Sequence, residues 1–407
     1  MLCARLKPTI ISQQSVDQAA YREGYSTEDH LITITLLLES CGEWNVSLCL
    51  GLVDFEKAFD TVEHGPLWQA LEELGVAAEY IDFIKVLYRE QESTVLAGKE
   101  SRAFPSERGV KQGDPISSLL FLAVMECIFR KLKKRWHQLN LRRASHLYGI
   151  VIDSEHEPLT NLRFADDVIL VASSRADIRK MILDLKKEAA RFGMKINASK
   201  TKVMATDPAA RESPLKCGEL AVQVLQAGES EKYLGRKLSV DDYHACELNH
   251  RLATGWAAFF KFKGALCNKG IPLSDRAALF EAVVTPCVLY ACGTWVLTAD
   301  MVRKLRSTQR KMFRRIVRIL RRPGEPWPDY VSRATHTSED SIFAVGAKDW
   351  VTLQDSRKLE LATKCMLHNS ARWSNRLLQW KPWFRCLPRR NVGHPVKRWL
   401  DSFESMQ

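Results

Sequence analysis

The chain of 407 residues carries 60 Lys and Arg side chains against 48 Asp and Glu, a formal net charge of +12. A composition of 46% hydrophobic and 27% charged residues is typical of a folded globular protein and excludes an acidic disordered chain. Residues 1–205 hold 27 basic and 28 acidic side chains, whereas residues 206–407 hold 33 and 20, so the whole surplus lies in the second half. We therefore expect a polyanionic partner for that half.

The cellular setting is predicted from two features. No run of about 18 uninterrupted apolar residues occurs, so no membrane span and no membrane partner are expected. The 11 cysteines follow no paired rhythm and form no C-x-x-C motif, which favours a reducing compartment. We expect an intracellular protein, nuclear or cytoplasmic or both. Nothing in the sequence predicts its oligomeric state.

Helices and one buried strand are predicted in the first hundred residues. Ser26 offers an N-cap, with Asp29 three residues later, ahead of apolar residues at helical spacing, so a helix through about Ser40 is predicted. The nearly continuous apolar run 46–53 has the length of a strand buried on both faces. Further elements predicted here are helices over 67–74 and 80–88 and a short strand over 93–97.

The middle of the chain predicts a second set of strands. A turn-rich loop, Gly109–Pro115, precedes a long helix over 116–136. The stretch 162–172 predicts two strands joined at a turn that holds Asp166 and Asp167. The other elements predicted here are a strand over 148–152 and a helix over 176–192.

From about residue 206 the pattern becomes mainly helical. Short strands are predicted over 220–225 and 233–234, and helices over 243–266, 274–292 and 300–320. The stretch 323–342 carries Pro, Asp and Ser and predicts a linker. Seven of the 11 tryptophans lie beyond residue 290, so the remainder of the chain is rich in Trp.

Three acids stand at the ends of predicted strands. Asp54 follows the strand over 46–53, and Asp166 and Asp167 lie between two apolar strands. Neighbouring carboxylates beside a buried sheet repel each other, and a divalent cation with hard oxygen ligands would resolve that repulsion. Two Mg²⁺ ions ~3.5–4 Å apart serve phosphoryl transfer in this way. The alternative is an ordinary hairpin turn, in which Asp is common.

Five stretches carry a resemblance to one family. They are Asp54–Val62, Gly109–Ser117, Phe164–Asp167, Phe192–Asn197 with Lys200 and Thr201, and Tyr233–Gly235. In this order they resemble the first and second catalytic motifs, the catalytic box, the motif that follows it and the primer-grip hairpin of reverse transcriptases from non-LTR (LINE-type) retrotransposons. The similarity covers about residues 20–240.

The resemblance implies an α+β, right-hand polymerase fold with a ferredoxin-like split βαβ palm, partial fingers and a helical thumb. The implied domains are partial fingers over 1–45, palm with the remaining fingers elements over 46–240, a basic helical thumb over 241–322 and a Trp-rich extension over 323–407. The implied activity is RNA-directed DNA polymerisation, in which a primer 3′-hydroxyl attacks the α-phosphate of a dNTP. Its partners would be an RNA template, a DNA primer and the RNA–DNA duplex.

The resemblance also implies a metal site. Asp54 and Asp166 would bridge two Mg²⁺ ions, which Mn²⁺ could replace, and Asp167 would support one of them. The backbone carbonyl of Phe55 would be a further ligand. Lys200 is a candidate general acid for the leaving pyrophosphate, with a solvated surface lysine as the alternative.

The remaining implied contacts are to nucleotide and nucleic acid. Phe59 would lie under the sugar and exclude a 2′-hydroxyl, with core packing as the alternative. Gln112 and Gly113 would approach the incoming nucleotide and the template base. Arg22 is a candidate template or phosphate contact, with a plain surface role as the alternative. The hairpin residues Tyr233, Leu234 and Gly235 would contact the primer.

One predicted helix is strongly basic. Residues 303–322 contain ten Lys or Arg and no acid, and Leu305, Met312 and Ile316 mark an apolar stripe on it. We expect its opposite face to follow a duplex backbone through phosphate contacts. The residues proposed for this are Arg310, Lys311, Arg314, Arg315 and Arg318. A solvated charged face and a nuclear-localisation signal are the alternatives.

The chain departs from the family pattern at its beginning. The upstream fingers motif, which places basic side chains over the triphosphate, has no counterpart in the sequence. We therefore expect an element truncated in the fingers, either active as a polymerase or a catalytically inactive fragment that retains only nucleic-acid binding. A host-adopted RNA-binding protein is a more distant hypothesis.

Overall fold

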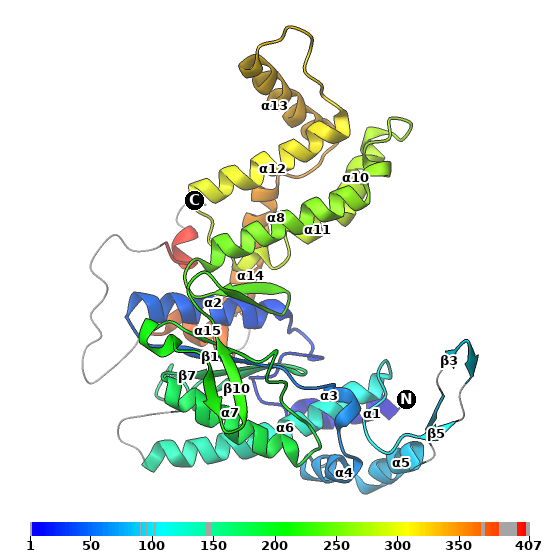
Figure 1. Cartoon of the computed structure of the whole chain (residues 1–407), viewed down its shortest axis with the longest axis vertical. Coiled ribbons are helices and arrows are strands. Elements are labelled where there is room, and N and C mark those ends of the chain that lie inside the picture. Colours follow the sequence, from blue (N-terminus) through cyan, green and yellow to red (C-terminus); the bar gives the residue numbers. More distant parts are fainter. Residues whose placement is uncertain are drawn as a thin grey trace. The chain divides into compact units, whose positions relative to one another are not determined.

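The computed structural model describes residues 2–89, 91–94, 96–100, 103–142, 148–367, 371–381 and 397–403. They pack as two compact units, each with a hydrophobic core of its own. The first unit comprises Met1–Glu229 and Asn369–Gly393, and the second comprises Ser230–His368 and His394–Gln407. In Figure 1 the labels β1, α6 and α7 mark the first unit, and α8, α12 and α13 mark the second.

A six-stranded sheet forms the centre of the first unit, in the order β6-β7-β1-β8-β10-β9. Its strands are β1 (Cys49–Val53), β6 (Asn161–Phe164), β7 (Asp167–Ala172), β8 (Lys202–Ala205), β9 (Leu215–Cys217) and β10 (Leu220–Val224). β1 is antiparallel to β7 and β8, and β6 is antiparallel to β7, so β1 and β6 run parallel with β7 between them. The connection from β1 to β6 contains α6 (Pro115–Arg142), and α7 (Arg175–Ala190) joins β7 to β8. This is the split βαβ arrangement, which confirms the predicted α+β palm fold.

Both faces of β1 are buried, as the apolar run predicts, although the strand begins only at Cys49. Cys49 and Val53 belong to the core that the helices complete. The alternate residues Leu50 and Leu52 point to the opposite face and are buried as well. Burial on both faces explains why the run shows no polar alternation.

Helices surround this sheet. They are α1 (Leu2–Ser12), α2 (Thr27–Glu43), α3 (Ala58–Thr61), α4 (His64–Glu73), α5 (Ala78–Arg89) and α15 (Trp373–Gln379), besides α6 and α7. The predicted cap of α2 is confirmed, since the Ser26 N–H donates to the Asp29 carboxylate at 2.7 Å. α6 continues beyond its predicted end to Arg142, and the buried Asn140 in this extension exchanges hydrogen bonds with the Tyr148 backbone. No helix in the described ranges has an apolar stretch long enough to cross a membrane.

Short elements complete the first unit. They are β2 (Glu92–Ser93), β3 (Leu96–Ala97), β4 (Lys99–Glu100), β5 (Phe104–Pro105) and the 3-10 turn η1 (Pro208–Arg211). The strand predicted over 93–97 is therefore divided between β2 and β3. The strand predicted over 148–152 is wrong, because Ile150 forms only an isolated bridge with Leu159. Gly149, with φ +88°, turns the backbone there.

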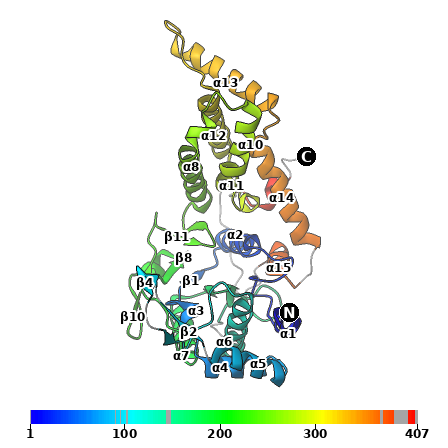
Figure 2. The same ribbon diagram turned by 90° about the vertical axis from the view of Figure 1, so that its right-hand side faces the viewer.

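The second unit begins with a hairpin and continues as helices (Figure 2). Its elements are β11 (Ser230–Tyr233), β12 (Arg236–Ser239), α8 (Tyr243–Lys261), α9 (Lys263–Leu266), α10 (Leu273–Val283), α11 (Thr285–Val288), η2 (Cys292–Thr294), α12 (Ala299–Val317), α13 (Trp327–Ala344), α14 (Trp350–Leu367) and η3 (Leu400–Ser402). In its core the Phe280 ring meets Phe313 edge-on at 5.0 Å and stacks on Trp350 at 5.7 Å. The three predicted helices are confirmed, with breaks before Lys263 and Thr285; Pro286 cannot donate the helical hydrogen bond at the second break.

The predicted linker over 323–342 is wrong, since most of it forms α13. Pro328 lies in the first turn of this helix, where the missing N–H costs nothing, and Asp329 complements the helix dipole there. Residues that suggest a loop in sequence therefore act as a helix start.

Candidate active site

The three predicted acids meet at one end of the sheet. Asp54 directly follows β1, and Ala165 and Asp166 form the two-residue turn between β6 and β7. Val53 pairs with Val168, so continuing the register by one residue sets Asp54 opposite Asp167. The sequence prediction that strand ends gather these carboxylates agrees with this register.

Their charges act on one another. Burial, then the negative charges of Asp166 and Asp54, raises the pKa of Asp167 to about 6. Burial and the charge of Asp54 also raise the pKa of Asp166. The buried Oδ2 of Asp54 accepts no hydrogen bond from any described residue, and the Lys200 Nζ lies 3.9 Å from it, too far for one. The site therefore carries more negative charge than its surroundings neutralise.

The donor set suits a hard divalent cation bound together with substrate. Among the described residues, no three His, Cys, Asp or Glu side chains gather into a ready metal cage. Mg²⁺ does not require one, because it is commonly bound by one or two carboxylates together with water and substrate phosphates. Two mutually repelling carboxylates and an unpaired oxygen of a third fit that pattern.

The residues after Asp54 are fixed by the segment that precedes β8. The Asp54 carbonyl accepts the N–H of Asn197 at 2.8 Å, and Phe55 pairs with Ile196 in an isolated bridge. The Phe55 side chain is buried, so only its backbone can face the site. Phe59 stacks on Phe121 of α6 at 4.5 Å between ring centroids while remaining partly exposed. Its ring is thus anchored by core packing.

Two glycines hold the short helix α3 close to its neighbours. A β-carbon at Gly109 would lie 2.8 Å from the Asp60 carbonyl oxygen, and one at Gly193 would lie 2.5 Å from that of Thr61. Both glycines have positive φ, near +91° and +78°. The second motif and the motif after the catalytic box therefore both pack against the first motif through glycine.

The loop before α6 is exposed and linked to the first motif. The Gln112 side-chain amide donates to the Asp60 carboxylate at 3.1 Å. Gly113 adopts φ +89° with no atom near its would-be β-carbon. The Asp114 carboxylate accepts the N–H of Ile116 and caps the start of α6. Gln112 and Gly113 are thus presented at the surface next to the first motif.

Lys200 and Arg22 differ in how much their side chains are engaged. The Lys200 side chain is 69% exposed and its ammonium has only the distant Asp54 contact among described residues. The Arg22 guanidinium donates to the Ser15 carbonyl at 3.1 Å and lies 4.5 Å over the Tyr25 ring. Lys200 is therefore available to a ligand, whereas Arg22 already holds its own segment together.

Of the predicted primer-grip residues, Tyr233 ends β11, and Leu234 and Gly235 form the turn of the β11–β12 hairpin in the second unit. Leu234 and Gly235 both have positive φ, the conformation of a tight two-residue hairpin turn. The Tyr290 hydroxyl donates to the Leu234 carbonyl at 2.7 Å, and the Arg251 guanidinium donates to the Gly235 carbonyl. The Tyr233 side chain is buried, whereas Leu234 and Gly235 are half-buried.

The basic residues of 303–322 differ in what their side chains contact. Arg303, Arg306 and Arg310 pair with Asp300, Asp349 and Glu339. Arg314 and Arg315 lie over aromatic rings, those of Tyr330 and of Trp256 and Phe260. Lys311 and Arg318 are exposed. Acids from α12 itself, from α13 and from the loop before α14 thus neutralise part of a face that looks uniformly positive in sequence.

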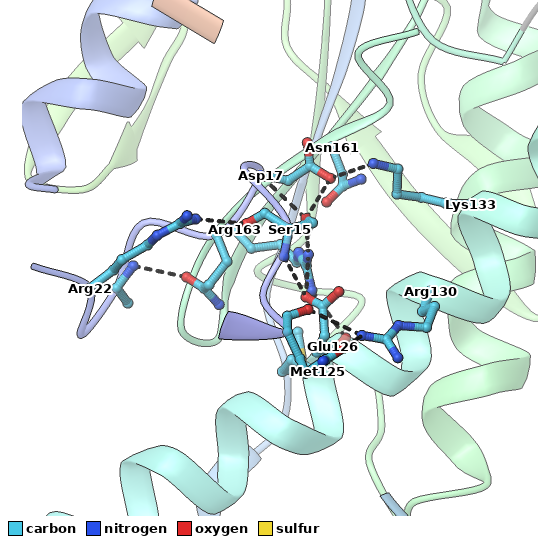
Figure 3. A network of polar contacts seen from close by, with 12 residues as sticks. Ser15, Asp17, Arg22, Met125, Glu126, Arg130, Lys133, Asn161 and Arg163 are labelled. Atoms are coloured by element: carbon cyan, nitrogen blue, oxygen red, sulfur yellow. Dashed lines mark hydrogen bonds and ion pairs between the residues drawn. The ribbon is translucent and has the colours of Figure 1, made fainter. Parts of the chain in front are cut away.

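Sequence reasoning missed a buried polar network on β6, the strand that leads into the turn at Ala165 and Asp166 (Figure 3). Arg163 on β6 and Glu126 on α6 form an ion pair at 2.9 Å, and both side chains are almost fully buried. Gln18 is buried next to them. The available signal was a single charge inside each of two otherwise apolar segments, since isolated charges there require a buried partner.

Comparisons with known proteins agree with the motifs. The family model "Reverse transcriptase (RNA-dependent DNA polymerase)" matches residues 1–238. An uncharacterized transposon-derived protein of Caenorhabditis elegans is 28% identical over 247 residues, covering 60% of this chain and 84% of the worm protein. A retrovirus-related Pol polyprotein from retrotransposable element R2 of Nasonia vitripennis is 28% identical over 197 residues, covering 46% of this chain and 18% of the polyprotein.

Two further similarities span more of this chain. The transposon TX1 149 kDa protein of Xenopus laevis is 29% identical over 314 residues, covering 74% of this chain and 22% of that protein. Among solved structures, the apo telomerase of Candida tropicalis gives a TM-score of 0.40 at 12% identity, covering 92% of this chain and 60% of that one. The chain thus spans about a fifth of the long transposon proteins it matches.

Proposed function

We propose that this chain, which belongs to the reverse transcriptase family, is an RNA-directed DNA polymerase of a non-LTR retrotransposon. The observation that carries the proposal is the set of three carboxylates at the strand ends, whose negative charge is compensated only by the distant Lys200 ammonium among the described residues. Its relatives among retrotransposon Pol proteins support the same conclusion. The expected partners are an RNA template, a DNA primer, their duplex and a dNTP.

Asp54, Asp166 and Asp167, with the Phe55 carbonyl, would hold two Mg²⁺ ions. Bound Mg²⁺ would favour ionisation of the primer 3′-hydroxyl and stabilise the charge of the leaving pyrophosphate. The new bond joins the primer 3′-oxygen to the α-phosphorus of the dNTP, and the bond that breaks joins that phosphorus to the pyrophosphate oxygen. Asp166 and Asp167 are both exposed, so a metal and a substrate could reach their carboxylates from solvent.

The other residues act on nucleotide and proton. The Phe59 ring, held against Phe121, would exclude a ribose 2′-hydroxyl by its bulk. Gln112 and Gly113 would line the nucleotide on the exposed loop before α6. Lys200, whose ammonium is exposed near Asp54, would give a proton to the leaving pyrophosphate.

Primer extension tests the proposal. Purified protein should extend oligo(dT) on poly(rA) with dTTP and Mg²⁺, and the double variant Asp166→Ala, Asp167→Ala should not. Equal extension by both proteins would refute the polymerase assignment. Salt-sensitive binding of the duplex without any extension would instead support the alternative, an inactive element that retains only nucleic-acid binding.

A further inference from the structure

Residues 15–20, which precede α2, form a segment that lies along the outer edge of β6. β6 leads directly into the turn at Ala165 and Asp166. Gln18 pairs with Arg163 in a parallel bridge. The Arg163 N–H donates to the Asp17 carbonyl at 2.8 Å, and the Ala19 N–H donates to the Arg163 carbonyl at 3.0 Å. β6 is an edge strand of the sheet, so this segment covers an edge that would otherwise be unpaired.

The Gln18 side chain reaches the turn at Ala165 and Asp166 itself. Its Oε1 accepts the N–H of Ala165 at 3.2 Å and the N–H of Ala20 at 2.9 Å. Gln18 is 1% exposed, so water does not compete for these bonds. Ala165 has φ +57°, a backbone conformation that a β-carbon disfavours. Gln18 therefore holds the residue whose conformation sets the direction of Asp166 and Asp167.

A buried ion pair fixes the segment to the palm. The Arg163 guanidinium donates to the Glu126 carboxylate at 2.9 Å, to the Met125 carbonyl at 3.2 Å and to the Ser15 hydroxyl at 2.7 Å. The Ser15 N–H also donates to Glu126, at 3.3 Å. Figure 3 shows these contacts converging between the segment, β6 and α6. A buried pair with all these bonds specifies one geometry rather than adding much stability.

Asp17, the residue before Gln18, provides a second anchor for the segment. The fully buried Asp17 carboxylate accepts from the Lys133 ammonium at 2.9 Å and from the Trp373 indole N–H at 2.8 Å. The segment is thus held by α6 through both Glu126 and Lys133, and by the start of α15. Because the segment is fixed at Ser15 and at Asp17, the position of Gln18 relative to Ala165 is fixed as well.

We propose that Gln18 is a positioning residue of the polymerase site. Its Oε1 holds the Ala165 turn so that Asp166 and Asp167 present their carboxylates in one orientation to the divalent metal, and the Arg163–Glu126 pair holds Gln18 in turn. The inference rests on the proposed polymerase function. Groups that orient metal-binding carboxylates have large effects when removed, of ~10–100-fold on metal affinity or activity.

The variant Gln18→Met removes the acceptor while keeping the length of the side chain. We expect ~10-fold weaker Mn²⁺ binding, measured by electron paramagnetic resonance, and ~10-fold lower kcat with the KM for dTTP little changed. Gln14→Met is the matched control. Gln14 lies in the same segment and is buried, and its side-chain amide contacts no described partner, so both quantities should stay at the wild-type level.

Unchanged Mn²⁺ binding and kcat in Gln18→Met would overturn the proposal, as would an equal loss in Gln14→Met. Should Gln18→Met not fold, amide hydrogen exchange in the wild-type protein decides instead. Slow exchange of the Ala165 N–H supports its bond to Gln18, and exchange at the rate of an open amide overturns it. A wild-type protein that binds Mn²⁺ at Asp166 and Asp167 without extending a primer would refute only the polymerase function.

Discussion

Charges of one sign are crowded in two places: at Asp166 and Asp167 in the first unit, here called the acidic turn, and on α12 in the second unit. The two places differ in how far opposite charges neutralise them. Asp166 and Asp167 lie near Asp54 with little compensation, and burial together with the neighbouring negative charges raises their pKa values. On α12, Arg306 pairs with Asp349 in the loop before α14, and Arg310 pairs with Glu339 on α13. Repulsion between carboxylates that the protein does not neutralise can be relieved by a bound cation. Charges that already pair within the protein mainly stabilise its folded structure. The uncompensated group is therefore the stronger sign of a site, although the basic run is far more conspicuous in the sequence.

Removing one acid should give the largest effect. We expect Asp54→Asn to lower primer extension by about 1,000-fold, since it removes a charged metal ligand without changing shape. Steady-state extension on poly(rA) with oligo(dT) measures this. Glu56→Gln is the matched control, because Glu56 is exposed on the same motif and its backbone bond to Lys195 remains. Comparable losses in the two variants would show that any charge on this motif matters.

Breaking a buried charge pair in the first unit should cost stability instead. Arg372 donates to the Asp29 carboxylate at 2.7 Å and to the Gly24 carbonyl at 2.9 Å. We expect Arg372→Met to lower the free energy of unfolding by about 3 kcal/mol, because it leaves a buried carboxylate without its cation. Denaturant unfolding measures this.

An exposed arginine provides the control for that loss. Arg398 pairs with Asp401 one turn away, and about half of its side chain is exposed. Arg398→Met should cost less than about 1 kcal/mol. If Arg372→Met costs no more than Arg398→Met, the segment before α15 is not needed to hold the start of α2.

The sequence identifies the acids of this site but not the residues that hold them in position. Asp54, Asp166 and Asp167 are identifiable because an acid that ends an apolar strand is visible in a linear pattern. Gln18 and Arg163 are not, because their role depends on which segment lies beside β6, and pairing between distant segments leaves no periodic signal. The linker prediction over 323–342 failed for a local reason, because a proline in the first turn of a helix looks the same in sequence as a proline in a linker.

Metal binding at the acidic turn should depend on pH. The pKa of Asp167 is raised to about 6, and a protonated carboxyl cannot bind the cation, so affinity should rise as pH increases through 6 and level off above 7. Lowering the pH from about 7 to about 5 should weaken Mn²⁺ binding by ~10-fold. Titration at several pH values measures this.

The control for the pH effect removes the titrating group. Asp167→Asn should bind Mn²⁺ more weakly at neutral pH and lose most of the dependence between about 5 and 7. The Asp167 carboxylate is only partly covered, and solvent screens part of its repulsion, so the same variant should gain only about 1 kcal/mol of stability without metal. A pH dependence that persists unchanged in Asp167→Asn would assign the titration to another group.

The smallest effect is expected on the basic helix, where the pairing pattern predicts which residues contact phosphate. Lys311 and Arg318 are exposed, whereas Arg310 is paired with Glu339 at 2.6 Å. Replacing Lys311 or Arg318 with Gln should each reduce the slope of log affinity against log salt by ~0.9 for a duplex, because one fewer counterion is released. Arg310→Gln should change the slope less, since Glu339 already supplies the counter-charge. Filter binding at several salt concentrations separates the two cases. Equal slopes for all three variants would mean that the acids of the neighbouring helices do not decide which basic side chains reach the nucleic acid.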